Sequence, residues 1–389
     1  MSLRQITEKN GKNNQLLYFT SSSITEESLV YISDTSGHPN LFCRNLATGA
    51  TRQITQQTEG YMRSYVYFDG QPYAGFGKAS PSLDCKNGLV YYLQGTEIRC
   101  VSLSGESRLI ARLPSDQMTG FTHVSADGRL LCVPTVDAEA LDGFIPGVSP
   151  FSYMDDKVHT DNLSSYLRVF DTQTGEEVIC ERVPRCWITH VQFSPIDSSL
   201  ILYNHEWCRD SGIRRMWLFD GSRHIPMRTE DLKQNRSRDD WTCHEMWQAD
   251  GAYIIYHGTY ANGNAYIGRV RADGEELVEI PLPEEFRSYG HFTSGRLHND
   301  LLVCDGYYRT PDDIREVSED AAKSNWITIQ RVNWEARTIQ WIPLVKHESS
   351  WQSQDEHPHP IFNDTDSHVF FTSDQSGKRA VYTIETSLI

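Results

Sequence analysis

An internal repeat is the feature of this sequence that most narrows the folds available to it. A unit of about 35 to 60 residues recurs, each time with a short strand pattern, a polar turn and two or three further strands. Seven units fit, and they begin near Phe19, Ala79, Thr122, Thr189, His244, Gly290 and His357. Four-stranded units at this period are typical of β-propellers, whose blades surround a central channel. The sequence therefore predicts an all-β fold, a seven-bladed β-propeller that takes residues 1–389 as a single domain.

The two chain ends predict how the blades close into a ring. Residues 4–7 (Arg-Gln-Ile-Thr) repeat residues 52–55, which form the predicted outer strand of the first unit. The seventh unit ends after a third strand at residues 380–383. We therefore expect the N-terminal segment to supply the missing outer strand of the last blade, because this pairing hides two exposed strand edges.

Composition and charge exclude several classes of partner. The opening residues lack the apolar core of a signal peptide, and no run of about 18 apolar residues could span a bilayer. Nine scattered cysteines do not resemble a disulfide framework, which favours a reducing, cytoplasmic location. The net charge of −16, from 36 Lys and Arg against 52 Asp and Glu, argues against nucleic acid as a partner. The sequence leaves the oligomeric state open.

Histidine recurs at one position of the repeat. Counting back three residues from the residue that opens the first turn of a unit gives His190, His244, His291 and His359. Rotation about the propeller axis relates equivalent positions, and the start of the innermost strand lies nearest that axis. One histidine at this position could simply cap a turn, but four together predict a site at one mouth of the channel.

The segment Gln354–His359 adds metal-ligand chemistry to this mouth. It places an amide and two imidazoles within six residues, and the period-2 alternation of a strand keeps His357 on the same side as His359. Imidazole nitrogen binds zinc, manganese and iron, and an amide oxygen suits the harder ions in that group. One further histidine would complete a mixed nitrogen and oxygen site.

Extra loops and basic residues are predicted at the same end of the blades. The longest insertions are residues 56–78, 137–165 and 305–325. Long loops over a ring of histidines are what a substrate site needs. The loop between the second and third strands of unit four also carries His205, Arg214 and Arg215 to this end.

Units four to seven resemble the oligogalacturonate lyases, a family of seven-bladed propellers with a manganese-type metal in the channel. The resemblance rests on Asn204-His205-Glu206, Arg215-Met216-Trp217, residues 243–247, Gly290-His291 and residues 354–360. It implies a metal bound by His291, Gln354, His357 and His359. It also implies that His244 is the catalytic base and that Arg215 assists charge stabilisation. We expect His190, His205 and Arg214 to contact substrate. Units one to three are less similar, and the 137–165 insertion is unusual.

The resemblance implies a lyase that cleaves short uronate oligosaccharides, such as di- and trigalacturonate, by β-elimination. The proton on C5 of a uronate is α to a carboxylate, and the sugar oxygen on C4 is a β leaving group. A divalent ion, Mn²⁺ by resemblance, and Arg215 would neutralise the negative charge that grows as the proton leaves. A neutral histidine can accept that proton near neutral pH.

Two other classes of function remain open from the sequence. One is a hydrolase, or a lyase, acting on another acidic oligosaccharide, because propellers carry many chemistries. The other is a non-catalytic binding module that presents one face of the propeller to a partner. Ultraviolet absorbance from an unsaturated uronate separates these classes, because only a lyase produces it.

Overall fold

Antiparallel β-strands make up nearly all of the regular structure. The computed structural model describes residues 2–57, 61–62, 73–74, 81–143, 150–206, 214–228, 240–283, 290–306, 308, 326–352 and 354–386. The chain divides into two compact units. Unit 1 comprises Met1–Phe19 and Asp239–Ile389, and unit 2 comprises Thr20–Arg238. The all-β prediction is confirmed, whereas a single domain over residues 1–389 stays a prediction. No helix among the described ranges is long and apolar enough to cross a membrane.

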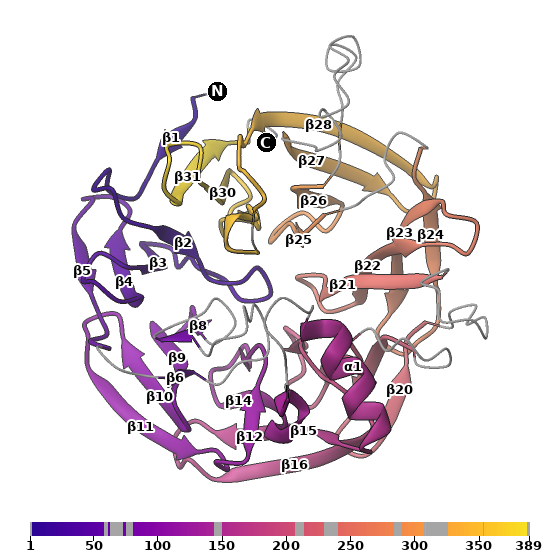
Figure 1. Ribbon diagram of the computed structural model, residues 1–389. Helices are drawn as coiled ribbons and strands as arrows, with labels where there is room; N and C mark the ends of the chain where they lie inside the picture. Colours follow the sequence, from indigo (N-terminus) through magenta and orange to yellow (C-terminus); the bar gives the residue numbers. More distant parts are fainter. Residues whose placement is uncertain are drawn as a thin grey trace. The chain divides into compact units, whose positions relative to one another are not determined.

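Unit 1 contains three four-stranded antiparallel sheets, coloured salmon to yellow in Figure 1 except for the indigo N-terminal strand of the last sheet. The first comprises β21 (Trp241–Trp247), β22 (Tyr253–Thr259), β23 (Ala265–Arg271) and β24 (Val278–Pro281). The second comprises β25 (Phe292–Ser294), β26 (Leu301–Cys304), β27 (Trp326–Asn333) and β28 (Thr338–Lys346). The third comprises β29 (Ile361–Phe362), β30 (His368–Ser373), β31 (Ala380–Glu385) and β1 (Arg4–Gln5). Strand β2 (Asn14–Leu16) and the 3-10 turn η3 (Gln354–Glu356) complete the unit.

The N-terminal strand completes the last sheet. Strand β1 pairs antiparallel with β31, so that Arg4 lies opposite Thr383 and Gln5 opposite Tyr382. The two strands lie side by side in Figure 1. The predicted closure by the N-terminal segment is therefore confirmed.

Unit 2 repeats this antiparallel pattern, with a fifth strand in its third sheet. Its first two sheets contain β3 (Ser28–Ser33), β4 (Asn40–Asn45), β5 (Thr51–Gln53), then β8 (Ser82–Asp84), β9 (Leu89–Gln94), β10 (Glu97–Ser102) and β11 (Ser107–Arg112). The next two contain β12 (Gln117–Thr119), β13 (His123–Val124), β14 (Leu130–Asp137), β15 (Ser164–Asp171), β16 (Glu177–Pro184), then β17 (Val191–Phe193), β18 (Ile201–Asn204), β19 (Met216–Phe219) and β20 (His224–Pro226).

The three predicted insertions differ in how much of them is described. The 137–165 insertion forms a 3-10 turn, η1 (Ala138–Leu141), and a helix, α1 (Pro150–Thr160). A short hairpin of β6 (Tyr61–Met62) and β7 (Tyr73–Ala74) represents the 56–78 insertion. Most of the 305–325 insertion lies outside the described residues.

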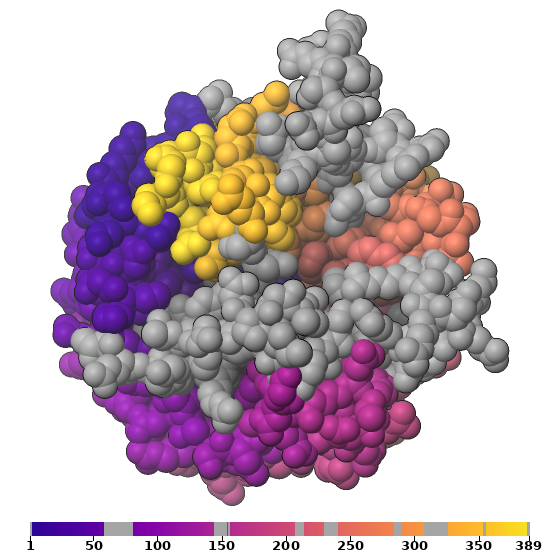
Figure 2. Space-filling model, in the orientation of Figure 1, coloured from indigo at the N-terminus to yellow at the C-terminus, as the bar shows by residue number. Residues whose placement is uncertain are grey.

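Strand β26 is a short apolar strand that is packed on both of its faces. Alternate side chains of a strand point to opposite faces of the sheet. Leu302 and Cys304 join a buried cluster with residues of the first sheet of unit 1, and Leu301 and Val303 join a cluster with residues of the last sheet. In Figure 2, the yellow residues near the C-terminus, which belong to the last sheet, lie against the orange residues that precede them in the chain. The residue that follows β26 is therefore held by packing on both faces.

Candidate metal and catalytic site

Three predicted ligands converge in unit 1. His291, His357 and His359 each offer a ring nitrogen, and these nitrogens lie within 4.8 Å of one another. The ring centroids of His291 and His359 are 4.0 Å apart, and those of His291 and His357 are 5.2 Å apart. His291 immediately precedes β25, and the other two histidines precede β29. Gln354 begins η3, but its side chain lies outside the described residues.

A carboxylate holds two of these histidines in place. Asp305, the residue after β26, is fully buried. Its Oδ1 accepts the backbone N–H of His291 at 2.7 Å, and its Oδ2 accepts that of His359 at 3.0 Å. The same Oδ2 lies 3.2 Å from His291 Nδ1. The sequence analysis missed this role and treated Asp305 only as the start of an insertion.

The ionisation of Asp305 fixes how His291 is presented. Burial raises the pKa of this carboxyl, but hydrogen bonds from His291 and from the His359 amide help to lower it below its usual value. An ionised carboxylate only accepts hydrogen bonds, so His291 carries its proton on Nδ1. The lone pair of His291 is then on Nε2. This carboxylate and histidine pairing is the usual support of a metal-ligating imidazole.

Gly290 allows the carboxylate to come this close. A Cβ atom at Gly290 would lie 2.3 Å from Asp305 Oδ1 and 2.6 Å from the backbone nitrogen of Gly306. Both separations are shorter than real Cβ contacts, so any side chain here would displace the carboxylate. Close packing against Asp305 therefore explains the glycine at position 290, and the chemistry of the cluster explains the histidine that follows it.

Aromatic side chains line the cluster. The ring of Phe19 stacks on His359 at 5.7 Å and meets His291 and His244 edge-on at 5.4 and 5.7 Å. The ring of Trp351 lies 4.2 Å from that of His357. Apolar rings exclude water, which strengthens electrostatic interactions inside the cluster.

His244 lies beside the three-histidine cluster, on a distortion of β21. Its ring centroid is 4.4 Å from that of His291. The pairing of β21 with β22 slips between Cys243 and Met246, so two residues oppose one, as in a β-bulge. His244 has a φ of 51°, in the left-handed region that non-glycine residues rarely adopt. Such strain is common at functional sites.

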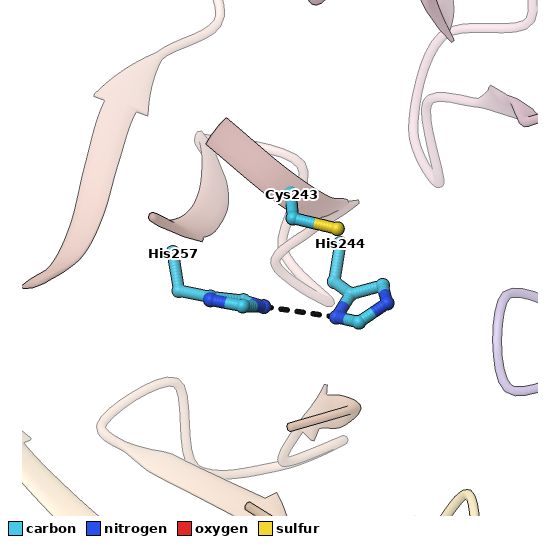
Figure 3. Close-up of side chains that lie close together, drawn as sticks. All are labelled: Cys243, His244 and His257. Atoms are coloured by element: carbon cyan, nitrogen blue, oxygen red, sulfur yellow. Dashed lines mark hydrogen bonds between the residues drawn. The ribbon is translucent and has the colours of Figure 1, made fainter. Parts of the chain in front are cut away.

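The partner of His244 is a second histidine that the sequence analysis did not single out. Nδ1 of His244 lies 2.9 Å from Nε2 of His257, a buried residue of β22, as Figure 3 shows. The Sγ of Cys243 lies close enough to both imidazoles that the three side chains could also hold a metal ion. His257 lies opposite Cys243 across the strand pair, so counting along the repeat could have found it.

In unit 2, Arg215 and His190 form part of a buried polar network. The Arg215 guanidinium donates to Glu206 at 2.9 Å and to His190 Nδ1 at 3.3 Å, and Arg215 and Glu206 are each 5% exposed. Glu206 also accepts from Asn204 at 3.0 Å and from the hydroxyl of Thr189. The Arg215 charge is therefore compensated locally, and its guanidinium is held in one orientation.

The structure shows a local contact with Trp217 for each of the two remaining predicted substrate residues, His205 and Arg214. His205 stacks on Trp217 with ring centroids 5.1 Å apart. Burial, followed by the charges of His224 and His159, lowers the pKa of His205 to about 3, so the ring is neutral at ordinary pH. The carbonyl of Arg214 accepts the indole N–H of Trp217 at 2.5 Å. Substrate contact by either residue stays a prediction.

Comparison with known proteins places this chain in a family. The family model described as oligogalacturonate lyase matches residues 18–387. The chain belongs to the oligogalacturonate lyase family. Over 346 residues it is 25% identical to an oligogalacturonate lyase of Dickeya dadantii, covering 85% of this chain and 80% of the relative. Over 345 residues it is 26% identical to an oligogalacturonide lyase of Pectobacterium atrosepticum, with the same coverage.

Solved structures of this family share the fold. An oligogalacturonate lyase in complex with manganese is 20% identical, with a TM-score of 0.76 over 98% of this chain and 92% of that chain. An oligogalacturonate lyase from Vibrio parahaemolyticus is 21% identical, with a TM-score of 0.78 over 99% and 94%. These likenesses confirm the predicted seven-bladed β-propeller.

Proposed function

We propose that this protein is a metal-dependent lyase that cleaves short oligogalacturonides by β-elimination. The observation that carries the proposal is the convergence of three imidazoles, with His244 beside them, in a chain of the oligogalacturonate lyase family. The acidic oligosaccharide is then the partner that matters. The sequence arguments for a cytoplasmic location are part of the same proposal.

The donor set fits a divalent transition metal. Three imidazole nitrogens within 4.8 Å of one another match the ligands that manganese, zinc and iron accept. The buried carboxylate of Asp305 bonds to His291 Nδ1 and so leaves Nε2 for the ion. We propose Mn²⁺, held by His291, His357, His359 and Gln354, because a related structure contains manganese. When bound, the ion would neutralise the uronate carboxylate and so acidify the proton on C5.

His244 is the proposed base. Its Nε2 would take the C5 proton, the electrons of that C–H bond would form the C4–C5 double bond, and the C4–O bond would break. The leaving oxygen then takes up a proton. A general base of this kind contributes about 10²- to 10⁴-fold to the rate. The adjacent rings of Phe19 and His291 limit the orientations open to His244.

Arg215, Arg214, His190 and His205 are proposed to act on the substrate side. Arg215 retains a permanent positive charge, and its bond to Glu206 keeps the guanidinium from rotating. His190 accepts from Arg215 at Nδ1, so its Nε2 carries a proton that can be donated to a carboxylate or hydroxyl. The proposed roles of these four residues rest on the sequence and on this local chemistry.

The proposal is tested by incubating Mn²⁺-loaded protein with digalacturonate and trigalacturonate. We expect ultraviolet absorbance from an unsaturated uronate, and products whose masses sum to that of the substrate. A hydrolase would add one water and leave the absorbance unchanged, and a binding module would leave the substrate intact. Either result would overturn the proposal. His244→Ala should retain the metal and lose about 10²- to 10⁴-fold in turnover.

A further inference from the structure

Three of the four repeated histidines face a hydrogen-bonding residue at one particular position on the second strand of their sheets, and in the fourth sheet that position is Thr372. The strand pairings match Phe193 with Ile201, Trp247 with Ile254 and Ser294 with Leu302. Moving three residues back on the first strand and three forward on the second gives the pairs His190 and Asn204, His244 and His257, His291 and Asp305. We call the second member of each pair the facing residue.

The facing residue is a hydrogen-bonding partner of its histidine in all three sheets. Asn204 accepts the backbone N–H of His190 at 2.7 Å, and Asp305 accepts that of His291 at 2.7 Å. Asp305 also reaches the Nδ1 of His291. In the sheet of His244, the β-bulge turns the imidazole itself toward the facing residue, so that Nδ1 lies 2.9 Å from His257 Nε2.

A backbone carbonyl determines which of these two nitrogens carries the proton. The Nδ1 of His244 also lies 3.3 Å from the carbonyl oxygen of Gly290. A carbonyl oxygen can only accept a hydrogen bond, so the proton between these groups is on His244 Nδ1. His257 Nε2 must then be the second acceptor, and the lone pair of His244 is on Nε2.

We propose that His257 is a positioning residue that keeps His244 in the tautomer needed for a base. The inference rests on the proposed function only in taking His244 as that base. Without the acceptor at His257, the longer 3.3 Å contact to the Gly290 carbonyl holds the Nδ1 proton more weakly, so the neutral ring of His244 could place its proton on Nε2 and could not accept one there. His257 thus does for the base what Asp305 does for His291, from the same position of the repeat. It contacts no substrate in this scheme.

Two substitutions separate positioning from simple packing. His257→Leu removes the acceptor, and His257→Gln offers an amide oxygen in its place. We expect His257→Leu to lower kcat by about 10- to 100-fold with little change in KM, as for other partners of functional imidazoles. His257→Gln should recover most of that loss. Equal kcat in the wild type and His257→Leu, or equal losses in both variants in step with lowered Tm, would overturn the inference.

Cys243→Ala separates the tautomer role from a metal role, because Cys243 lies opposite His257 on the neighbouring strand. It should leave the metal content unchanged. If it instead removed a bound ion, the Cys243, His244 and His257 group would be a metal site and the tautomer argument would fail.

Nitrogen NMR of the histidine-labelled protein, loaded with diamagnetic Zn²⁺, tests the same point without turnover. The His244 signals, identified by their loss in His244→Gln, should show a protonated Nδ1 and an unprotonated Nε2. The opposite assignment would overturn the inference even in an active enzyme. If the wild type cleaved no galacturonide, the proposed function would fail, and this spectrum would still decide the tautomer.

Discussion

His190 and His291 occupy the same position of the repeat and both present Nε2, but one carries a proton there and the other a lone pair. In unit 1, Asp305 accepts at His291 Nδ1, which leaves a lone pair on Nε2. In unit 2, the guanidinium of Arg215 donates to His190 Nδ1, which leaves a proton on Nε2. The facing residue is a carboxylate in one sheet and the amide of Asn204 in the other. One position can therefore supply a metal ligand or a hydrogen-bond donor, depending on its neighbour.

The charges around the two histidines differ in the same way. Glu206 uses its carboxylate on Arg215, Asn204 and Thr189, so the negative charge in unit 2 is compensated by the guanidinium. Within the described part of the chain, Asp305 bonds to the imidazole of His291 and to the backbone amides of His291 and His359. A cation bound to the histidines would balance the negative charge of the Asp305 carboxylate. The comparison is consistent with the proposed metal ligands in unit 1 and the proposed substrate contacts in unit 2.

The strongest test of this contrast is a matched pair of alanine substitutions. His291→Ala removes one of three converging imidazoles, so we expect Mn²⁺ affinity to fall by more than about 100-fold, beyond the loss typical of outer partners. His190→Ala should leave Mn²⁺ affinity unchanged and raise KM. Isothermal titration and elemental analysis measure both. Full metal occupancy in His291→Ala would remove this residue from the ligand set.

The facing residues provide a second test. Asp305→Asn gives the sheet of His291 the amide found in unit 2, and we expect Mn²⁺ affinity to fall by about 10- to 100-fold. Asn204→Asp is the reciprocal change. It would place a carboxylate beside Glu206, whose Oε2 is 3.0 Å from the Asn204 amide nitrogen, so it should lower stability and leave metal affinity intact. Equal metal affinities in wild type and Asp305→Asn would contradict the support role.

A third test breaks the compensation in unit 2. Glu206→Gln leaves the Arg215 guanidinium buried without its counter-charge, and we expect a loss of about 3 to 5 kcal/mol in unfolding free energy. Chemical denaturation measures this loss. Asp161→Asn is the control, because the Lys157–Asp161 pair is solvent-accessible and should contribute about 1 kcal/mol or less. Similar losses of unfolding free energy in the two variants would show that the buried network in unit 2 stabilises the fold no more than an exposed ion pair does.

Repetition made much of this molecule predictable from its sequence. Strand period and turn spacing predicted the β-propeller, and the repeat of residues 52–55 at residues 4–7 predicted the pairing of β1 with β31. The repeated histidines and the Gln354–His359 segment predicted which imidazoles converge in unit 1. These features follow from periodicity, which a single sequence displays directly.

The supporting residues could not be predicted in the same way. Asp305 and His257 act from second strands, and their roles depend on cross-strand register and, for His257, on a bulge. Phe19 contacts three histidines that follow it by more than two hundred residues. No local pattern marks such contacts. The helix α1 within the 137–165 insertion likewise interrupts the repeat and has no counterpart from which to infer it.

The last test concerns His205 and measures how the free energy of unfolding changes with each pH unit. It distinguishes a buried, packed ring from one that is open to substrate. Its pKa is lowered to about 3, from an ordinary value of 6.5. Between those pH values the unfolded chain binds a proton at this residue and the folded chain does not, so stability rises with pH by at most about 1.4 kcal/mol per unit. His205→Phe, which keeps a ring against Trp217, should flatten the pH dependence of unfolding over this window. The exposed His38 provides the control substitution, His38→Gln, which should leave the slope unchanged. An unaltered slope in His205→Phe would mean that the folded protein protonates His205 readily, as expected of a side chain open to substrate.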